Sequence, residues 1–379
     1  MVCCRPGLLA LLALLLALPA TADARRAPQG FYGVTWDSAY NRRPQAEQDA
    51  QWDLMARSGV ESVRAVFSWA VAQPKPERPV SFEQTDRLVA RAAARRIRLL
   101  PIVFEAPGWA RFERWKRNSP PADPAGYAAY LRALVIRYGR RGTFWRQHPE
   151  LPRQPVTEWQ IWNEPNLPFY WDVAPGSARS FPRGYVQLLK AARWAIKGRD
   201  RNSKIVLGGL SNDSWTYLRA LYKARAKRLF DIVAVHPYTK APRDALVLVR
   251  AIRGAMRRAH DSRKPVWVTE LGWPAARGKL PVDEGLLRLT TTDGRMAKRL
   301  GAAYDAFLRT RKSRRYGVGR LYWFSWASSY RPGEGGIWEY SGLLVAGRTA
   351  FWPTPALAAY QRSARRNQGC VKSRWGACR

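Results

Sequence analysis

Eight short apolar segments, rich in β-branched and aromatic residues, alternate along this 379-residue chain with longer stretches of helical periodicity. Such alternation is typical of β/α units, which build a parallel sheet. The candidate strands cover residues 30–36, 62–69, 98–105, 157–164, 204–212, 232–239, 266–273 and 320–328. Eight units predict a (β/α)8 TIM barrel of the α/β class, a fold that takes about 250 residues or more.

The predicted barrel forms one domain between two terminal segments. Residues 1–24 contain Arg5, then an apolar run over 8–18 and then small residues, as in a secretory signal peptide. Cleavage after Ala22 or Ala24 fits equally well, and an uncleaved anchor is the alternative. The run is short for a membrane span, and no later stretch is apolar enough for one. We therefore expect a signal peptide over 1–24, a barrel domain over 25–355 and a tail over 356–379, in a secreted, extracellular or cell-envelope protein.

Two of the four cysteines lie close together in this tail. Cys370 and Cys378 are separated by seven residues, whereas Cys3 and Cys4 leave with the expected signal peptide. In an oxidising compartment such spacing favours a small disulfide loop. A metal site is disfavoured there, because no histidine or further cysteine lies nearby.

The formal charge of +37 gives a sequence pI near 11.1. A basic surface attracts nucleic acids, anionic membranes or acidic polysaccharides. Arginine and lysine are spread along the whole chain, however, which favours a compositional bias that solvates the helices. The charge alone therefore does not identify the substrate, and no specific nucleic-acid partner is expected.

Two glutamates directly follow apolar strand runs. Glu164 ends the fourth candidate strand and Glu270 lies in the seventh. A carboxylate at such a place is costly unless it faces a polar site, and both strands end on the same face of a parallel barrel. A single glutamate could instead form a structural salt bridge with one of the many arginines. The pair, however, is what glycoside hydrolysis requires.

Both glutamates lie in motifs that resemble clan A of the glycoside hydrolases, the retaining enzymes on (β/α)8 barrels. The sequence WNEP at 162–165 is similar to the acid/base motif of that clan, and TELGW at 269–273 is similar to its nucleophile motif. The pattern covers about residues 30 to 330 and is similar to the cellulase-like family 5 and the β-xylosidase-like family 39. The resemblance implies that Glu164 is the acid/base and Glu270 the nucleophile.

The resemblance extends to four more polar residues. Arg64 is similar to an arginine that keeps the nucleophile ionised, and Asn163 to a residue that binds the sugar 2-hydroxyl. His236 is similar to a sugar-contacting histidine, and Tyr238 to a tyrosine that touches the nucleophile. The alternatives are an ordinary strand-end arginine for Arg64 and a buried, backbone-bonded histidine for His236.

Aromatic residues at strand ends are candidates for sugar stacking. Trp323 resembles the sugar platform of the clan, and Trp326 is its rival on the opposite face of the strand. We expect about half of a second group to meet substrate and the rest to be core: Trp36, Trp69, Trp109, Tyr170, Trp171 and Trp273. Glu105 could line the cleft, whereas Glu334 and Glu339 are expected to be mainly solvated.

The resemblance implies a double displacement with retention, without a cofactor. Glu164 is expected to be protonated at the working pH and Glu270 to be ionised, with their carboxyl groups about 5–5.5 Å apart. No metal is expected, because His148, His236 and His260 share no ligand spacing. No nucleophile elbow, P-loop or dinucleotide fingerprint is present.

The expected partner is a carbohydrate, in the form of a β-linked glycan, and the expected state is a monomer. The sugar and the choice between exo and endo action stay open. The competing function is a carbohydrate- or cell-wall-binding barrel without turnover, although a binding protein would not need both glutamates. A basic nucleic-acid-binding protein is a more distant alternative, which predicts steeply salt-dependent DNA binding.

Overall fold

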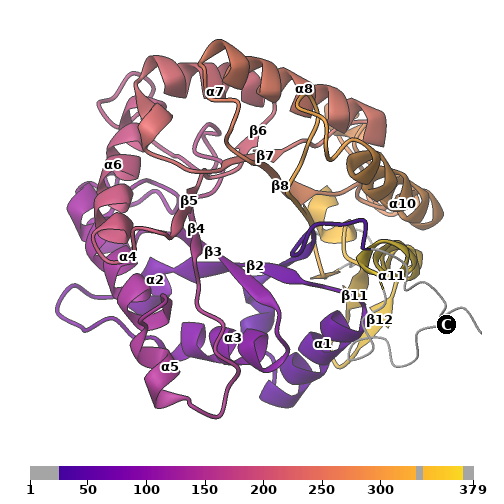
Figure 1. The fold of residues 1–379 in the computed structure, drawn as a ribbon, viewed down its shortest axis with the longest axis horizontal. Coiled ribbons are helices and arrows are strands. Elements are labelled where there is room, and N and C mark those ends of the chain that lie inside the picture. Colours follow the sequence, from indigo (N-terminus) through magenta and orange to yellow (C-terminus); the bar gives the residue numbers. More distant parts are fainter. Residues whose placement is uncertain (1–24, 330–335, 370–379) are drawn as a thin grey trace, which may run out of the picture.

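A computed structural model describes residues 25–329 and 336–369 of the chain. Parallel strands form a central barrel and helices surround it (Figure 1). The barrel strands are β1 (Tyr32–Trp36), β2 (Ser62–Ser68), β3 (Arg98–Phe104), β4 (Glu158–Ile161), β5 (Lys204–Val206), β6 (Leu210–Ser211), β7 (Val233–His236), β8 (Val266–Leu271) and β9 (Arg320–Trp323). The expected TIM-barrel class is therefore confirmed.

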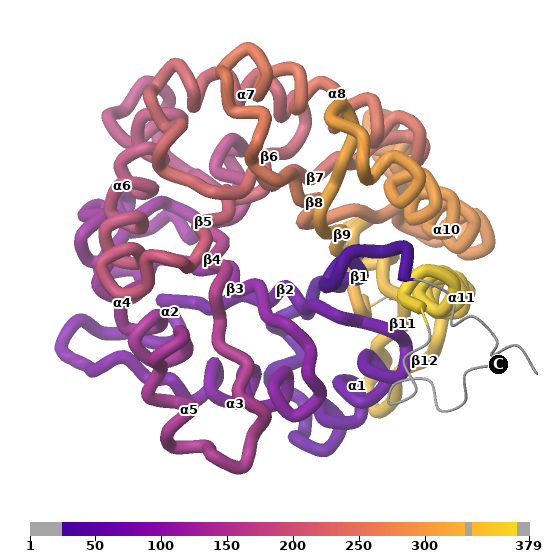
Figure 2. Tube along the Cα trace, in the orientation of Figure 1, coloured from indigo at the N-terminus to yellow at the C-terminus, as the bar shows by residue number. Residues whose placement is uncertain are grey.

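The fifth predicted strand, 204–212, is interrupted and appears as β5 and β6. The hydrogen-bonded order of the sheet is β5-β4-β3-β2-β1-β9-β8-β7-β6, so the two halves of this strand stand at its ends. An isolated parallel bridge between Val206 and Ile232 joins β5 to the chain just before β7. The backbone N–H of Leu207 also donates to the carbonyl of Ile232, at 3.1 Å. The ring of eight strands is thereby closed, and Figure 2 shows β1 beside β9 within it.

With β5 and β6 taken as one interrupted strand, each barrel strand is followed by at least one helix. The α-helices are α1 (Gln45–Arg57), α2 (Trp69–Ala72), α3 (Glu83–Ala94), α4 (Pro124–Tyr138), α5 (Thr143–Gln147), α6 (Arg183–Lys197), α7 (Ser214–Lys223), α8 (Pro242–Arg258), α9 (Glu284–Leu287), α10 (Asp293–Arg309) and α11 (Pro355–Gln368). The 3-10 helices in the described part of the chain are η1 (Ser38–Arg42), η2 (Gly108–Ala110), η3 (Ala226–Arg228) and η4 (Ile337–Tyr340). In the described ranges, no helix is long and apolar enough to cross a bilayer.

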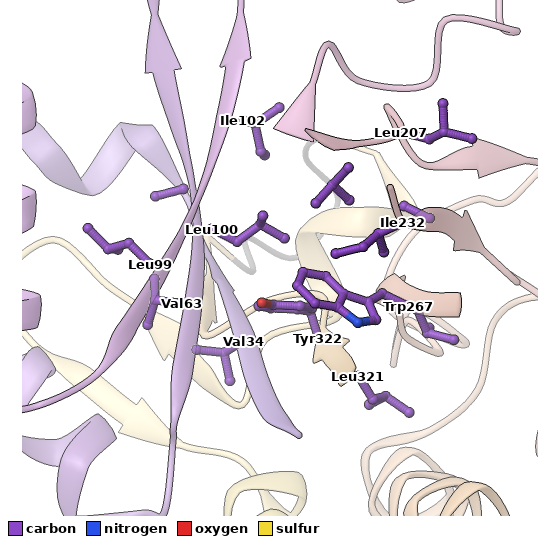
Figure 3. Close-up of a cluster of buried hydrophobic side chains, with 14 of the residues drawn as sticks. Val34, Val63, Leu99, Leu100, Ile102, Leu207, Ile232, Trp267, Leu321 and Tyr322 are labelled. Atoms are coloured by element: carbon purple, nitrogen blue, oxygen red, sulfur yellow. The ribbon is translucent and has the colours of Figure 1, made fainter. Parts of the chain in front are cut away.

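Local sequence explains these helices. In α4, for example, the side chain of Asp123 accepts a hydrogen bond from the backbone N–H of Ala125, and proline occupies the first helical position. The apolar residues of this helix, including Tyr127 and Leu131, recur at helical spacing and are buried. Inside the sheet, side chains from several strands meet in one hydrophobic cluster, in which Figure 3 labels Leu100, Trp267 and Tyr322 among others. This packing holds the strand ends, and hence the site, in fixed positions.

The carboxyl-terminal part of the barrel contains a second, smaller sheet. It is formed by β10 (Ala327–Ser328), β11 (Leu344–Ala346) and β12 (Phe351–Pro353). Helix α11 follows it as the eighth helix of the barrel and packs beside α10 (Figure 1). Its Asn367 carbonyl accepts hydrogen bonds from the backbone N–H groups of Arg26 and Ala27.

The expected tail over 356–379 thus begins inside α11, so the last barrel helix belongs to what we had assigned to the tail. The predicted Cys370–Cys378 loop and the predicted signal peptide over 1–24 lie outside the described residues.

Candidate active site

Glu164 is held at the end of the fourth strand by an unusual backbone. Strand β4 ends at Ile161, and both Trp162 (φ 66°) and Glu164 (φ 41°) adopt left-handed conformations. Such conformations cost about 1–3 kcal/mol each and occur mainly where the surroundings enforce them, often at functional sites. Here the N–H of Trp162 donates to the Val103 carbonyl at 3.0 Å, and that of Glu164 donates to the Gly208 carbonyl at 2.6 Å. The neighbouring strands on both sides therefore fix the direction of the Glu164 side chain.

Glu270 lies in β8, at an irregularity of the sheet. The register between β8 and β9 shifts between Val268 and Leu271. A bulge of this kind breaks the strict alternation of side chains, which explains how the neighbouring residues Thr269 and Glu270 both contact groups of the site. Thr269 is fully buried and Glu270 is 7% exposed.

Both carboxylate oxygens of Glu270 accept hydrogen bonds. Nη1 of Arg64 lies 2.5 Å from Oε1, and the hydroxyl of Tyr238 donates to Oε2 at 2.7 Å. Burial alone would raise the pKa of Glu270, but the charges of His236 and Arg64 and these hydrogen bonds lower it more. Its pKa therefore lies below the ordinary value of 4.5. Burial and the neighbouring Glu270 carboxylate raise the pKa of Tyr238 well above its usual value, so Tyr238 stays a hydrogen-bond donor.

His236 is fully buried between the two glutamates. Its Nδ1 lies 2.6 Å from Oε1 of Glu164 and 3.5 Å from Oε2 of Glu270. Its Nε2 lies 3.0 Å from the hydroxyl of Thr269. The structure thus places His236 in hydrogen-bond contact with the carboxylate of Glu164, whereas the sequence led us to expect a residue that contacts the sugar.

A chain of buried polar groups joins the two sides of the site. Nε of Arg64 donates to Oε1 of Gln160 at 2.7 Å, and Nη2 donates to Oδ1 of Asn163 at 2.7 Å. Nε2 of Gln160 donates to the Leu207 carbonyl at 2.9 Å and lies 3.4 Å from the hydroxyl of Thr269. Our sequence reasoning missed Gln160 and Thr269. The available signal was a glutamine inside an apolar strand, because a buried polar side chain needs a partner.

Glu164, His236 and Glu270 form a compact set. One oxygen of each carboxylate and one ring nitrogen lie within 4.8 Å of one another. Such donors could in principle hold a divalent cation. However, both Glu270 oxygens already accept hydrogen bonds, and the guanidinium charge of Arg64 opposes a second cation beside it. The donor set therefore suits proton transfer and nucleophilic attack better than metal binding.

A pocket of about 160 Å³ opens beside this set. Arg64, Asn163 and Glu270 line it together with Trp36, Tyr170, Phe324 and the exposed Asp37. Oδ1 of Asn163 is occupied by Arg64, while its Nδ2 has no acceptor among the residues that the structure describes. The pocket thus combines aromatic walls, a free amide donor and a carboxylate, as a sugar-binding site requires.

Phe324, which the sequence did not suggest, takes the place at the pocket that we expected for Trp323. Trp323 is fully buried, and its indole N–H donates to the Ser341 carbonyl at 2.9 Å. Alternation along β9 explains the difference: Tyr322 belongs to the central cluster of Figure 3, so Phe324 shares its side of the strand and Trp323 faces away. The rival Trp326 is also fully buried, with its N–H on Gln51.

The second group of aromatic candidates divides between pocket and core. Trp36 and Tyr170 line the pocket. Trp69, Trp171 and Trp273 are at most 4% exposed, and their indole N–H groups donate to Gln73, Arg179 and Thr239. Trp109 is half-buried against Trp69, with ring centroids 5.4 Å apart. The core members of this group hold loops together behind the cleft instead of lining the pocket.

The remaining candidates surround the site. Glu105 is half-buried at the end of β3 with φ 59°, and Glu339 in η4 accepts a hydrogen bond from the Ser329 hydroxyl. Glu334 lies outside the described residues. Trp338, also missed from the sequence, packs on Tyr238 with ring centroids 4.3 Å apart. It therefore braces the tyrosine that bonds Glu270.

Known proteins share this fold. No protein-family model and no curated protein matches the chain. Among solved structures, a family 39 glycoside hydrolase from the gut symbiont Bacteroides cellulosilyticus WH2 has a TM-score of 0.66 and 20% identity, over 89% of this chain and 64% of its own. GH5_18 from Streptomyces cattleya, solved with GlcNAc, has a TM-score of 0.66 and 20% identity, over 90% and 81%.

A monomeric β-xylosidase from Caulobacter crescentus CB15 is also similar, with a TM-score of 0.61 and 15% identity, over 90% of this chain and 69% of that protein. The chain thus spans less than two thirds of the family 39 enzyme. At these identities the comparisons establish a shared barrel fold with proteins that are glycoside hydrolases.

Proposed function

We propose that this protein is a glycoside hydrolase that cleaves β-linked glycans by double displacement with retention. One observation carries the proposal: two buried carboxylates, with oxygens within 4.8 Å of each other, have different hydrogen-bond environments. Retaining enzymes have carboxyl groups about 5–5.5 Å apart, whereas inverting enzymes need about 6.5–9.5 Å to admit a water molecule. The 4.8 Å distance joins one oxygen of each carboxylate, and we infer retention from this close approach.

Glu270 is the proposed nucleophile. Its lowered pKa keeps the carboxylate ionised, and Arg64 and Tyr238 hold it in one orientation. In the first step an oxygen of Glu270 attacks the anomeric carbon, while the bond from that carbon to the leaving oxygen breaks. The product of this step is a glycosyl ester of Glu270.

Glu164 is the proposed acid/base. It gives its proton to the leaving oxygen in the first step, and the aglycone departs as an alcohol. In the second step the Glu164 carboxylate removes a proton from water, and the water oxygen attacks the anomeric carbon. Glu270 leaves as a carboxylate, and the β-configuration is restored. His236, 2.6 Å from Glu164, orients this carboxyl group and takes part in its hydrogen bonding in both states.

Asn163 and the aromatic walls bind the sugar in this proposal. The free Nδ2 of Asn163 donates to the 2-hydroxyl, a contact that strengthens in the transition state. Trp36, Tyr170 and Phe324 surround the ring in the pocket. The similar solved proteins include a β-xylosidase and an enzyme crystallised with GlcNAc, which supports a β-glycoside without selecting the sugar.

A panel of aryl β-glycosides and β-linked polysaccharides tests the proposal. We expect turnover of at least one substrate and, by NMR, a β-anomer as the first product. Glu270→Ala should abolish turnover. Glu164→Gln should still release a first burst of aryl alcohol from glycosides whose leaving group departs without a proton, but its steady turnover should be slow, because the second step has lost its base. It should not cleave the polysaccharide, which also needs the acid in the first step.

The competing function is a carbohydrate-binding barrel without turnover. It predicts that the wild type binds a glycan from the panel and hydrolyses none, and that Glu270→Ala binds with unchanged affinity. An α-anomer as first product would instead show that the protein is a glycosidase that does not act by double displacement with retention. These two outcomes separate the reaction class from its stereochemistry.

We further propose that the protein is secreted and acts as a monomer. The leader-like composition of residues 1–24 supports the first point, and the similar β-xylosidase described as monomeric supports the second. Amino-terminal sequencing of the exported protein should begin after Ala22 or Ala24, and light scattering should give the mass of one chain. Retention in the cell or a dimeric mass would contradict the respective point.

A further inference from the structure

The positive charge is unevenly distributed between the two ends of the barrel. We call the end formed by the segments between helices and the following strands the rear face, because active sites of such barrels lie at the other end. These segments are 58–61, 95–97, 139–157, 198–203, 224–232, 259–265 and 310–319. They carry seventeen arginines and lysines but five aspartates and glutamates, an excess of twelve positive charges.

The opposite, catalytic end is close to neutral by the same count. The segments after the strands are 37–44, 69–82, 105–123, 162–182, 207–213, 237–241, 272–292, 324–329 and 336–354. These described segments hold fourteen basic and eleven acidic residues. The helix dipole favours basic residues at the carboxyl ends of helices. That effect fades within one turn, so it does not explain the excess of cations in the connecting loops.

The rear face contains a basic groove. A cavity of about 620 Å³ lies where the carboxyl ends of α4 and α6 approach α5. Six cationic residues line it: Arg140, Arg141, Arg146, Lys197, Arg199 and Arg201. The acidic side chain in this lining is Asp200. We refer to this cavity and these six residues as the basic groove.

Few of these cations are neutralised by the protein. Arg140 lies 3.3 Å from Asp200, and Lys197 lies 3.0 Å from Asp231. Asp200 is also occupied by its own loop, since it accepts hydrogen bonds from the Asn202 N–H and the Ser203 hydroxyl. The other four arginines are exposed and form no ion pair within the described ranges. The groove therefore presents several guanidinium groups to an external anion.

Apolar surface adjoins the groove. Ile136, 40% exposed, lies in its wall, and Trp194, 64% exposed, lies one turn before Gly198 on α6. The guanidinium of Arg132 covers one face of the Trp194 ring at 5.4 Å from its centroid. A sugar ring could pack against such a surface while its anionic groups pair with the arginines.

We propose that the basic groove binds an acidic polysaccharide, one that carries carboxylate or sulfate groups, at a site separate from the catalytic centre. Guanidinium groups pair with either anion in bidentate geometry. The preference for a polysaccharide over a nucleic acid rests on the proposed glycosidase function. It also rests on the shape of the face, where the described residues present helix ends, loops and the short helices α5 and η3 instead of a long recognition helix.

The test compares two triple variants of the full chain with equal charge. The groove variant is Arg141→Gln, Arg199→Gln and Arg201→Gln. The control variant is Lys190→Gln, Arg219→Gln and Arg250→Gln, which are exposed residues in the middle of α6, α7 and α8. Binding is measured to polygalacturonate, to chondroitin sulfate, to a neutral mannan and to duplex DNA, at low and at physiological salt. Polygalacturonate is α-linked, so a β-glycosidase does not consume it.

We expect the wild type to bind polygalacturonate, chondroitin sulfate or both, with an affinity that falls as salt rises, and to bind mannan more weakly. The groove variant should lose about tenfold in affinity, because each lost surface ion pair is worth about two- to threefold. The control variant should lose less than about twofold. Both variants should keep wild-type turnover of the aryl glycoside, because the groove lies at the opposite end of the barrel.

Three results would overturn the proposal. They are absence of binding to both acidic polymers, equal losses in the two variants, and tighter binding to DNA than to either polysaccharide at equal salt. The first two leave the glycosidase proposal intact, since turnover is measured separately. If the wild type hydrolyses none of the substrates, by contrast, the glycosidase proposal is wrong. The binding data then still test the groove.

Discussion

Replacement of Arg64 by methionine tests how the charge of the proposed nucleophile is stabilised. The guanidinium is 1% exposed and donates to Glu270, Gln160 and Asn163 at 2.5, 2.7 and 2.7 Å. Methionine is a long, flexible apolar side chain, but it provides none of these hydrogen bonds. Glu270 would then be a buried carboxylate with Tyr238 and His236 as its remaining partners.

The expected cost is large. Removal of one partner from a buried ion pair destabilises a protein by about 3–5 kcal/mol, because the other charge stays buried without compensation. We expect Arg64→Met to lower the free energy of unfolding by this amount at neutral pH, as measured by urea denaturation. Since the penalty comes from the isolated carboxylate, the double variant Arg64→Met with Glu270→Gln should recover a large part of it.

The pH dependence provides an independent check. The pKa of Glu270 in the folded protein lies below 4.5, so its ionised form stabilises the fold fully above pH 4.5. This stabilisation is lost as the pH falls through the folded pKa. Arg64→Met removes a charge that lowers this pKa. The stability difference between the wild type and the variant should therefore be largest at neutral pH and should shrink in acid.

Turnover should change in the same direction. Loss of a preorganised donor at a reacting carboxylate costs about 10²–10³ in rate, so kcat/KM for an aryl β-glycoside should fall by this factor. The acidic limb of the pH profile should move to higher pH. Arg64→Lys, which keeps the charge and loses the planar fork, should be intermediate. If Arg64→Met unfolds like the wild type and its acidic limb does not move, the assigned role of Arg64 is refuted.

Two further pairs of substitutions test the local geometry. Gly209 has φ +73°, and an added Cβ would lie 2.1 Å from Nε2 of His236, so Gly209→Ala should displace the histidine and lower kcat about 10²-fold. Gly278→Ala is its control, because Gly278 has φ +77° and no atom within 4 Å of an added Cβ; equal kinetics of the two variants would contradict the argument. Phe324→Ala should raise KM about three- to tenfold through lost ring contacts. Trp323→Ala should instead lower the free energy of unfolding by about 3–5 kcal/mol. If Trp323→Ala raised KM and left stability unchanged, while Phe324→Ala lowered stability and left KM unchanged, Trp323 and not Phe324 would be the residue that lines the pocket.

The strand order and the two glutamates were predictable because they depend on local rules. Apolar runs of strand length, separated by helical periodicity, define the barrel, and parallel strands bring their carboxyl ends to one face. Glu164 and Glu270 at two such ends therefore had to approach each other. The contact of Tyr238 with Glu270 was implied by the resemblance to clan A and is seen at 2.7 Å. The catalytic roles of these residues stay predictions until they are assayed.

Other features depend on contacts that no local pattern encodes. The break between β5 and β6 arises because Gly208 and Gly209 allow close approach: an added Cβ on Gly208 would lie 2.9 Å from the Ile161 carbonyl. The irregularity in β8 brings Thr269 to His236, which strict alternation does not anticipate. Likewise, a buried and a stacking tryptophan look alike in sequence, since both follow a strand.

The charge of the rear face was hidden for a different reason. Its cations come from six separate segments, so along the chain they look evenly dispersed, and the barrel gathers them at one end. Such an arrangement gives the molecule an electric dipole along the barrel axis. Near a negatively charged surface, the torque on that dipole turns the rear face inward and leaves the cleft with Glu164 and Glu270 pointing to solution. The barrel topology thus sets the orientation in which the molecule would adsorb as well as the place of its cleft.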